Sequence, residues 1–402
     1  MSTAPHGAAP TAQPAAPATD WWVVGPLSAG LLCLPLARAG TSAASIVLAL
    51  VLAWRLVRRE LQIPRELTFG IACFLITWGL SISGSLDDRA SLRDWLGWVA
   101  VCLPVLAVAG RRAAGPLPAG LQAAWISVSL LLGAWVVAEM WLGLHLLSGT
   151  FPGRVSLPML PNPNATAQYL LLLFAWCFAF ALRARGRAAG WWHAAWVPAA
   201  LLLSGCHTRA SWPAFAAVVG FSSRRARRPI LGWTAVAVFV AGNWLLRESL
   251  WQRVVDLTAL SDESIQGRVQ GWVVALRMIA RRPFTGEGLG AWKTAYGLLR
   301  SPDFRPLWPH AHNFYLHTLA ETGFLGLLGF GALLWGFRRV WWAGWSDPEP
   351  AAEELAMTAA LLGTAMVALF DVTWGGEAGY AFLVLAAFAL RRRSLTPAEV
   401  RG

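Results

Sequence analysis

Long apolar runs dominate this chain. From Trp21 onward, twelve of them are long enough to cross a membrane as helices, at about 17–25 residues per span. They fall near residues 21–38, 42–57, 68–84, 93–110, 119–146, 165–182, 188–205, 210–222, 230–247, 312–337, 354–371 and 378–390. With 56% hydrophobic and 13% charged residues, a soluble enzyme would expose large apolar patches. The sequence therefore predicts an all-α polytopic membrane protein with about twelve transmembrane helices.

Arginine clusters on alternate loops indicate how the chain is oriented. One face receives Arg55, Arg58, Arg59, Arg65, Arg111, Arg112, Arg183, Arg185, Arg187, Arg224, Arg225, Arg227, Arg228, Arg338, Arg339, Arg391, Arg392, Arg393 and Arg401. The opposite short loops and helix ends hold far fewer bases: Arg38, Arg89, Arg93, Arg154, Arg209 and Arg247. By the positive-inside rule the rich face is cytoplasmic, and both termini are then cytoplasmic. The net charge of +12 thus reflects topology, and nucleic-acid binding is disfavoured.

Five regions follow from this reading. An Ala/Pro-rich tail, expected to be disordered, covers residues 1–20, and nine membrane helices follow over 21–247. Residues 248–311 form a large loop on the non-cytoplasmic face, three further helices cover 312–390, and residues 391–402 form a cytoplasmic tail. Within the loop, apolar residues at helical spacing predict an amphipathic helix from Ser264 to Arg282. Pro283 ends that helix, and a Gly-rich turn follows at residues 286–290.

Three histidines, His310, His312 and His317, lie where the large loop enters the tenth span. Asn313 can cap that helix, and the positive helix end disfavours a protonated imidazole beside it. A histidine kept neutral there can act as a general base. Two other readings remain: a polar helix start, or a metal pair formed by His310 and His312. Because no carboxylate lies nearby in sequence, no metal or other cofactor is expected.

Arginines on the non-cytoplasmic face are the second signal. Arg154, Arg209 and Arg268 oppose the positive-inside trend, and the planar guanidinium suits a phosphate. Together they predict an anionic ligand, although each alone could snorkel to the interface. The acids Asp371 and Glu377 flank the turn between the last two spans and are expected to be solvated or capping residues.

The compartment limits the donor. ATP and nucleotide sugars do not reach a site outside the membrane, so group transfer there needs a donor that arrives already activated. A lipid-linked diphosphate sugar fits, because its leaving group is an anion that the arginines can stabilise.

In these features the chain resembles the O-antigen ligase family, within the superfamily of O-antigen ligases, polymerases and protein O-oligosaccharyltransferases. The resemblance rests on the twelve spans, the large loop before the tenth and four short segments. These segments are residues 208–209, residues 267–268 with Trp272, residues 283–288, and residues 312–313 with Leu316.

The resemblance implies a fold similar to C-type membrane glycosyltransferases. It also implies metal-independent, inverting transfer of a glycan from undecaprenyl diphosphate to a hydroxyl of the lipid A–core oligosaccharide, in lipopolysaccharide biosynthesis at the periplasmic face of the inner membrane. His312, Arg209 and Arg268 match the family's essential histidine and arginines, with Thr208 where Ser is more common. Substrate-binding roles are expected for Arg154, Asn162, Asn164, His310 and Asn313, and the loop helix is expected to form a lid over the acceptor.

Three alternatives remain. An O-antigen polymerase or a protein O-oligosaccharyltransferase would use the same donor with a different acceptor. A secondary transporter for an anionic substrate would also explain twelve spans and membrane-edge arginines, but transporters tend to place polar residues at the midplane and to show repeated halves.

Overall fold

The computed structural model describes residues 20–33, 38–110, 118–142, 154–157, 160, 162–245, 263–302, 308–374 and 376–391. Within these ranges the chain is all-helical, with one isolated bridge between Leu157 and Leu160 and no strand. The helices are α1 Trp21–Cys33, α2 Arg38–Val57, α3 Arg65–Leu80, α4 Asp88–Ala109, α5 Ala119–Leu142, α6 Pro163–Arg183, α7 Arg187–Gly205, α8 Ser211–Arg225, α9 Pro229–Leu245, α11 Glu263–Arg281, α12 Trp292–Leu299, α13 Phe314–Gly336, α14 Arg338–Ser346, α15 Ala352–Ala368 and α16 Gly376–Arg391.

Each of the twelve predicted membrane segments coincides with one helix, from α1 to α9 and then α13, α15 and α16. Three helices in the described ranges are long and apolar enough to cross a membrane: α4, α6 and α13. Shorter apolar helices occur within α2, α5, α9 and α16. The structure therefore confirms an all-helical membrane protein, while the count of twelve spans, the division into domains and the orientation stay predictions. The predicted tails lie outside the described residues, except for Asp20 and Arg391.

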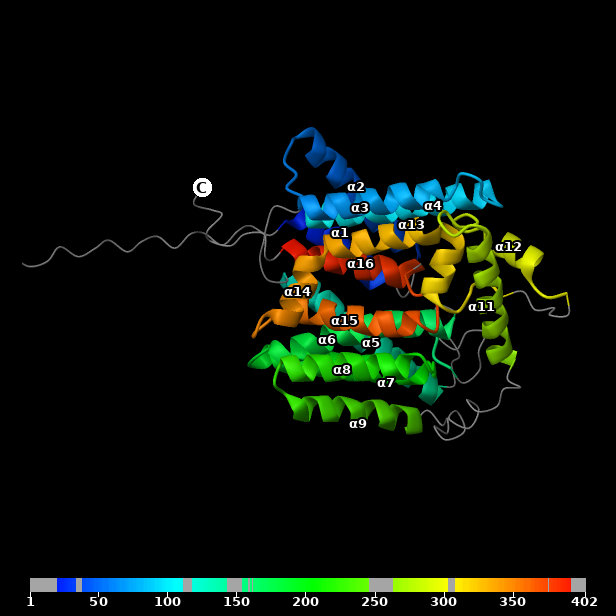
Figure 1. Ribbon diagram of the computed structural model, residues 1–402. Coiled ribbons are helices and arrows are strands. Elements are labelled where there is room, and N and C mark those ends of the chain that lie inside the picture. Colours follow the sequence, from blue (N-terminus) through cyan, green and yellow to red (C-terminus); the bar gives the residue numbers. More distant parts are fainter. Residues whose placement is uncertain are drawn as a thin grey trace, which may run out of the picture.

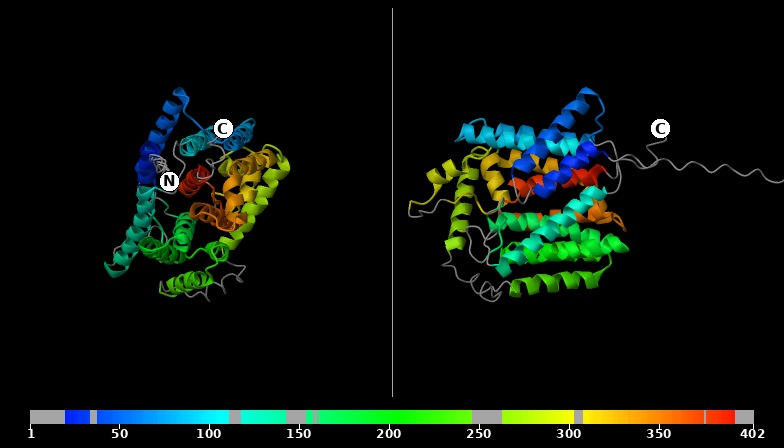
Figure 2. Two further views of the ribbon diagram at one scale, coloured as in Figure 1. Left: turned by 90° about the vertical axis from the view of Figure 1, so that its left-hand side faces the viewer. Right: turned by 180° about the vertical axis from the view of Figure 1, so that it is seen from behind.

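The helices pack roughly alongside one another, and α11 runs across one end of the bundle (Figure 1). The same crossing is visible from behind in Figure 2, whose end-on view places α16 in the interior. We call the end of the bundle that α11 crosses the α11 end. Burial agrees with the pictures, because α6 and α16 are apolar on nearly every face and almost wholly enclosed. A helix that is hydrophobic all round belongs in the centre of a bundle.

Predicted cytoplasmic arginines lie at the other end of the bundle. Helix α6 begins at Pro163 at the α11 end and finishes with Arg183, roughly 30 Å away at 1.5 Å per residue. At that far end α3 and α14 are joined, because Arg338 and Arg339 both donate to the Glu66 carboxylate, at 2.9 and 3.0 Å. The arginine-rich ends therefore cluster away from the candidate site, as the positive-inside rule would require.

The loop helix α11 begins and ends within one residue of its predicted bounds, and α12 was not predicted. Only part of the predicted apolar stripe is covered, since Val269 and Leu276 are about half exposed, at 47% and 56%. The fully buried face instead carries Val274, Ala275 and Met278, which form a small core with α12 and the start of α13.

The Gly-rich turn at residues 286–290 docks into a break in α13. Gly323 leaves the helical conformation, with φ 65° and ψ −169°, so two amides lose their partners within the helix. Phe324 and Leu325 donate instead to the carbonyl oxygens of Pro283 and Phe284, at 2.9 and 3.1 Å. A β-carbon at position 323 would overlap the Phe284 backbone, so the close approach requires glycine. The large loop is thereby fixed to a membrane helix.

Candidate active site

Four helix ends meet beneath α11. Helices α6, α8 and α13 begin at this end of the bundle, and α15 finishes there. The residues immediately before α8 and α13 and those immediately after α15 therefore come together. These segments carry Arg209, His312 and Asp371, although the three are far apart in the chain.

A cluster of two histidines and one carboxylate forms the centre of the site. The Asp371 Oδ1 lies 3.7 Å from His310 Nε2 and 3.8 Å from His312 Nδ1. Asp371 and His312 are nearly buried, and the two imidazole rings lie 4.2 Å apart between centroids. The His312 backbone occupies the left-handed region, with φ 50°, and its amide donates to His310 Nδ1 at 3.2 Å. Such a backbone conformation is costly for a residue with a side chain and is concentrated at functional sites.

The cap of α13 explains why these groups meet. Asn313 is the N-cap, as predicted, and its Oδ1 accepts a hydrogen bond from the Leu316 amide at 2.9 Å. Its Nδ2 donates to the Leu369 carbonyl at 3.0 Å, at the end of α15. One side chain thus ties the start of α13 to the end of α15, which holds Asp371 beside His312.

Both imidazoles of the cluster are kept neutral. Burial lowers the pKa of His312 to about 3, with further lowering by His310 and the positive charge of Arg268. Burial also lowers the pKa of His310, against the opposing effect of Asp371. Neither ring nitrogen of His312 forms a hydrogen bond with the described residues. A neutral, unbonded imidazole can accept a proton from a ligand.

Arg209 and Arg268 lie together in a small pocket, which we call the arginine pocket. Its lining residues are Asn164, Ala167, Thr208, Arg209, Ala210, Ser211, Arg268, Val367, Phe370 and Asp371. Two arginines here stand beside the N-terminal ends of α6 and α8, where the helix dipole favours negative charge. The combination suits a phosphate or diphosphate.

Other predicted ligand-binding residues are engaged with the backbone. Arg154 donates through Nε to the Cys206 carbonyl at 3.0 Å and through Nη2 to the His207 carbonyl at 3.4 Å. It thereby supports the turn that leads to Arg209. The Asn162 side chain caps α6 by accepting from the Asn164 amide at 2.8 Å. Of the predicted substrate-binding residues, Asn164 lines the arginine pocket and His310 joins the histidine cluster.

A close contact with α11 requires a glycine at position 267, directly before Arg268. A β-carbon there would overlap the Trp308 indole, which lies against α11 at this position. Trp308 in turn meets the His312 ring edge-on, with centroids 5.1 Å apart. Gly267 therefore allows a contact that links the helix carrying Arg268 to the segment carrying His312.

Two contributors to the site were missed from the sequence. The prediction that Asp371 is solvated or capping was wrong in its burial, because only 5% of the residue is exposed and its carboxylate faces both histidines. The Glu377 side chain lies outside the described residues. Trp308 was passed over as one of 25 tryptophans. An acid directly after an apolar helix, at the end where the histidines lie, was the available signal for Asp371.

Asp371 also changes the question of a metal. Ligand atoms of His310, His312 and Asp371 all lie within 4.8 Å of one another, a spacing that a metal ion could bridge. The Arg268 charge, which lowers the pKa of both histidines, opposes a cation at the same place. Two neutral imidazoles and one carboxylate, beside an arginine, suit proton transfer better than metal binding.

Fold and site together define a helical membrane protein with an anion pocket beside a neutral histidine. A family model described as O-antigen ligase matches residues 194–331 and supports the O-antigen ligase family, to which the sequence bears resemblance. The matched stretch includes Arg209, Arg268 and His312 and ends before Asp371. No curated protein matches the chain. The matched family and the candidate membrane helices are consistent with a multi-pass membrane protein.

Proposed function

We propose that the protein is an O-antigen ligase. It transfers a glycan from undecaprenyl diphosphate to a hydroxyl of the lipid A–core oligosaccharide, on the periplasmic side of the inner membrane, with inversion and without a metal. The observation that carries this proposal is the arginine pocket beside His312. One wall of that pocket is Asp371, whose carboxylate also lies 3.8 Å from the imidazole.

The arginine pocket, about 20 Å³ in volume, would admit one phosphate oxygen of the donor as it stands, and its lining side chains would move apart to hold the diphosphate. Arg209 and Arg268 can each donate paired hydrogen bonds to phosphate oxygens, and the N-terminal ends of α6 and α8 add favourable dipoles. During transfer, negative charge grows on the departing diphosphate. Preorganised positive groups at that position stabilise the transition state more than the ground state.

His312 would act as the base. The acceptor O–H gives its proton to a His312 ring nitrogen, while its oxygen forms a bond to the anomeric carbon. The bond between that carbon and the diphosphate oxygen breaks, and its electron pair leaves with the diphosphate. Asp371 stabilises the imidazolium that results. A single displacement inverts the configuration at the anomeric carbon.

Donor binding would also strengthen the base. In the free protein, the Arg268 charge helps to lower the pKa of His312. A bound diphosphate offsets that charge, which removes one of the smaller causes of the low pKa and makes His312 a stronger base than in the free protein. Helix α11 would cover donor and acceptor as a lid.

The test is transfer by the purified protein with synthetic undecaprenyl-diphosphate glycan and rough lipopolysaccharide, with and without EDTA. A glycan ladder on lipid A–core, insensitive to EDTA, is the expected result. Elongation of the donor glycan would identify a polymerase, and transfer to Ser or Thr of a peptide would identify a protein O-oligosaccharyltransferase. Loss of transfer in EDTA, restored by a divalent cation, would assign the cluster of His310, His312 and Asp371 to a metal instead.

A further inference from the structure

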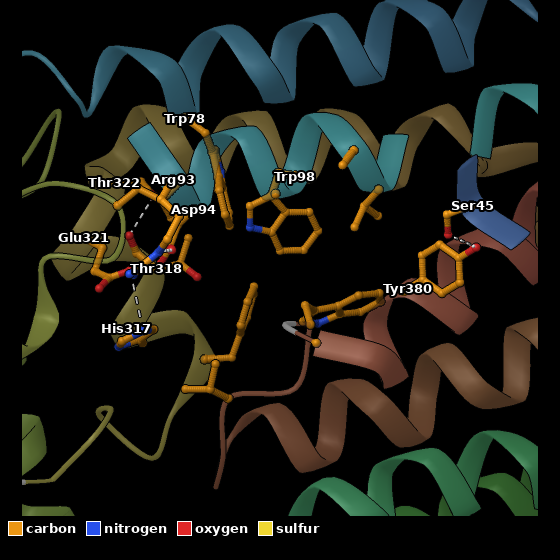
Figure 3. A pocket seen from close by; sticks show the side chains of 18 of the residues that line it. Ser45, Trp78, Arg93, Asp94, Trp98, His317, Thr318, Glu321, Thr322 and Tyr380 are labelled. Atoms are coloured by element: carbon orange, nitrogen blue, oxygen red, sulfur yellow. Dashed lines mark hydrogen bonds and ion pairs between the residues drawn. The ribbon is translucent and has the colours of Figure 1, made fainter. Parts of the chain in front are cut away.

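A second cavity, of about 800 Å³, lies among α2, α3, α4, α13 and α16 (Figure 3). Its lining comes from the first turns of α2, α13 and α16 and the first half of α4, so it opens at the same end of the bundle as the arginine pocket. The two spaces share a wall. Asp371 lines the arginine pocket, and the next residue, Val372, lines the cavity. Phe314, two residues after His312, lines the cavity as well.

We infer that this cavity binds the sugar ring of the acceptor whose hydroxyl is glycosylated, an inference that rests on the proposed function. The two spaces adjoin at residues 371–372, and His312 lies 3.8 Å from Asp371. A hydroxyl that projects from the mouth of the cavity past the edge of this wall would approach the anomeric carbon from the side away from the diphosphate, as an in-line displacement requires.

The walls of the cavity are aromatic. Trp78 and Trp98 meet edge to face, with centroids 5.1 Å apart, and Phe314 and Trp374, with centroids 6.4 Å apart, also line the cavity. Tyr380 closes the far end, where its hydroxyl pairs with Ser45 at 3.0 Å (Figure 3). A sugar ring has C–H faces that pack on such rings and a rim of hydroxyl groups that seeks polar partners.

The polar groups at one end of this cavity include two carboxylates. Asp94 and Glu321 gather with Thr318 at the end nearest the large loop. Carboxylates accept hydrogen bonds from hydroxyl groups and repel phosphate. The Arg93 guanidinium is already paired with Asp94, at 2.9 Å. The cavity therefore suits a neutral polyol, whereas the arginine pocket suits an anion.

The same polar end argues against a hydrocarbon occupant. A prenyl chain would take water away from Asp94 and Glu321 without offering hydrogen bonds in return, which is unfavourable. Ile46 lines the cavity and is 60% exposed, so the space opens sideways beside α2. A sugar carried on a membrane-anchored molecule can enter by that route.

Binding to the detergent-solubilised full-length protein tests the inference. The probes are deacylated core oligosaccharide, the free repeat-unit oligosaccharide and undecaprenyl diphosphate. We compare Trp98→Leu and Glu321→Gln with Trp342→Leu, a control that removes a 73% exposed tryptophan of α14. Glu321→Gln should weaken saccharide binding about tenfold, the effect of losing one hydrogen bond to a charged group, and Trp98→Leu should weaken it by about the same factor because it removes an aromatic face. They should leave undecaprenyl diphosphate binding unchanged, and the control should match wild type.

Three results would overturn the inference. These are saccharide binding unchanged in the folded variants, weakened binding of undecaprenyl diphosphate alone, and a wild-type protein that binds neither saccharide. If Trp98→Leu lowers the melting temperature, the saccharide affinity of Glu321→Gln decides the test. The glutamine side chain keeps the size of the glutamate and one of its acceptor oxygens. The proposed function is read separately, from the product that wild type forms. Formation of an elongated donor glycan would refute the proposed ligase function. The proposal for the cavity would still be tested, because it depends on the saccharide affinity of the variants relative to wild type.

Discussion

His312 Nδ1 lies 3.8 Å from Asp371 Oδ1, across a contact that Asn313 holds in place by capping α13 and bonding to the end of α15. The pair resembles a base and its orienting carboxylate in geometry. Its burial keeps the imidazole neutral until a proton arrives from the acceptor.

Replacing His312 should abolish transfer without unfolding the protein. A general base contributes about 10²- to 10⁴-fold, so His312→Ala should lose activity by that factor or more. Transfer of labelled glycan to rough lipopolysaccharide measures the loss, and the melting temperature reports folding. A folded His312→Ala variant with wild-type activity would remove the base assignment.

Asp371 should act through His312. A unit charge at 3.8 Å is worth about 4 kcal/mol at an effective dielectric constant of 20, so Asp371→Asn should lower kcat by up to roughly 10³-fold. Once His312 is gone, removing Asp371 should cost little more. A double-mutant cycle on kcat checks this coupling, and additive losses would show that the two residues act independently.

The arginines should divide into two kinds. Arg268→Ala should abolish transfer and weaken undecaprenyl diphosphate binding, with little change in melting temperature. Arg154→Ala removes two hydrogen bonds to backbone carbonyls and should lower the melting temperature instead, since each is worth about 1 kcal/mol or more. Donor affinity and thermal unfolding of both variants separate these effects. Equal loss of donor binding in a stable Arg154→Ala would give Arg154 a direct ligand-binding role.

Gly267 offers a test of the link between α11 and the histidine segment. Gly267→Ala must displace Trp308, so transfer should fall at least tenfold. Gly220→Ala is the matched control, because no atom lies within 4 Å of its added carbon and alanine favours a helix by about 1 kcal/mol. Measured side by side, the control should keep wild-type activity. Full activity in Gly267→Ala would show that the Trp308 contact is dispensable.

Stability should depend on pH through His312. Its pKa of about 3 in the folded protein lies below its ordinary value of 6.5. Between these values the unfolded chain binds a proton that the folded protein does not, so His312 costs stability as the pH falls below about 6.5 and costs nothing above it. The wild-type melting temperature should therefore drop more steeply from pH 7 to pH 5 than that of His312→Gln. Parallel curves would contradict the burial of a neutral imidazole.

Much of the fold follows from local sequence. Apolar runs marked all twelve segments that form bundle helices, because a membrane leaves a helix as the only way to satisfy the backbone of such a run. Pro283 and Asn313 marked helix boundaries through local chemistry that one turn of helix decides. The short helix α12 was not predicted, because its eight residues are too few to show a clear helical periodicity of apolar residues. The buried face of α11 depends on which neighbour it meets, which its own sequence does not specify.

The candidate site, too, has residues that could be predicted from local sequence and residues that could not. Arg209, Arg268 and His312 stood out because a charge or imidazole at a membrane edge is unusual in its own segment. Asp371 did not, because its role depends on the packing of α13 against the end of α15, and that contact joins segments distant in the chain. The cavity lined by Trp98 and Glu321 is likewise assembled from five helices, and the sequence of no single one of them indicates it.

The break in α13 also makes the large loop a part of the membrane bundle. Two amides within this helix, those of Phe324 and Leu325, take their partners from residues 283 and 284 of the loop. If the loop came away, both amides would be left unsatisfied in the middle of the helix, at a cost of about 1–3 kcal/mol each. Loop and helix should therefore open in one cooperative event, and deuterium uptake at these two amides would report the docking of the loop.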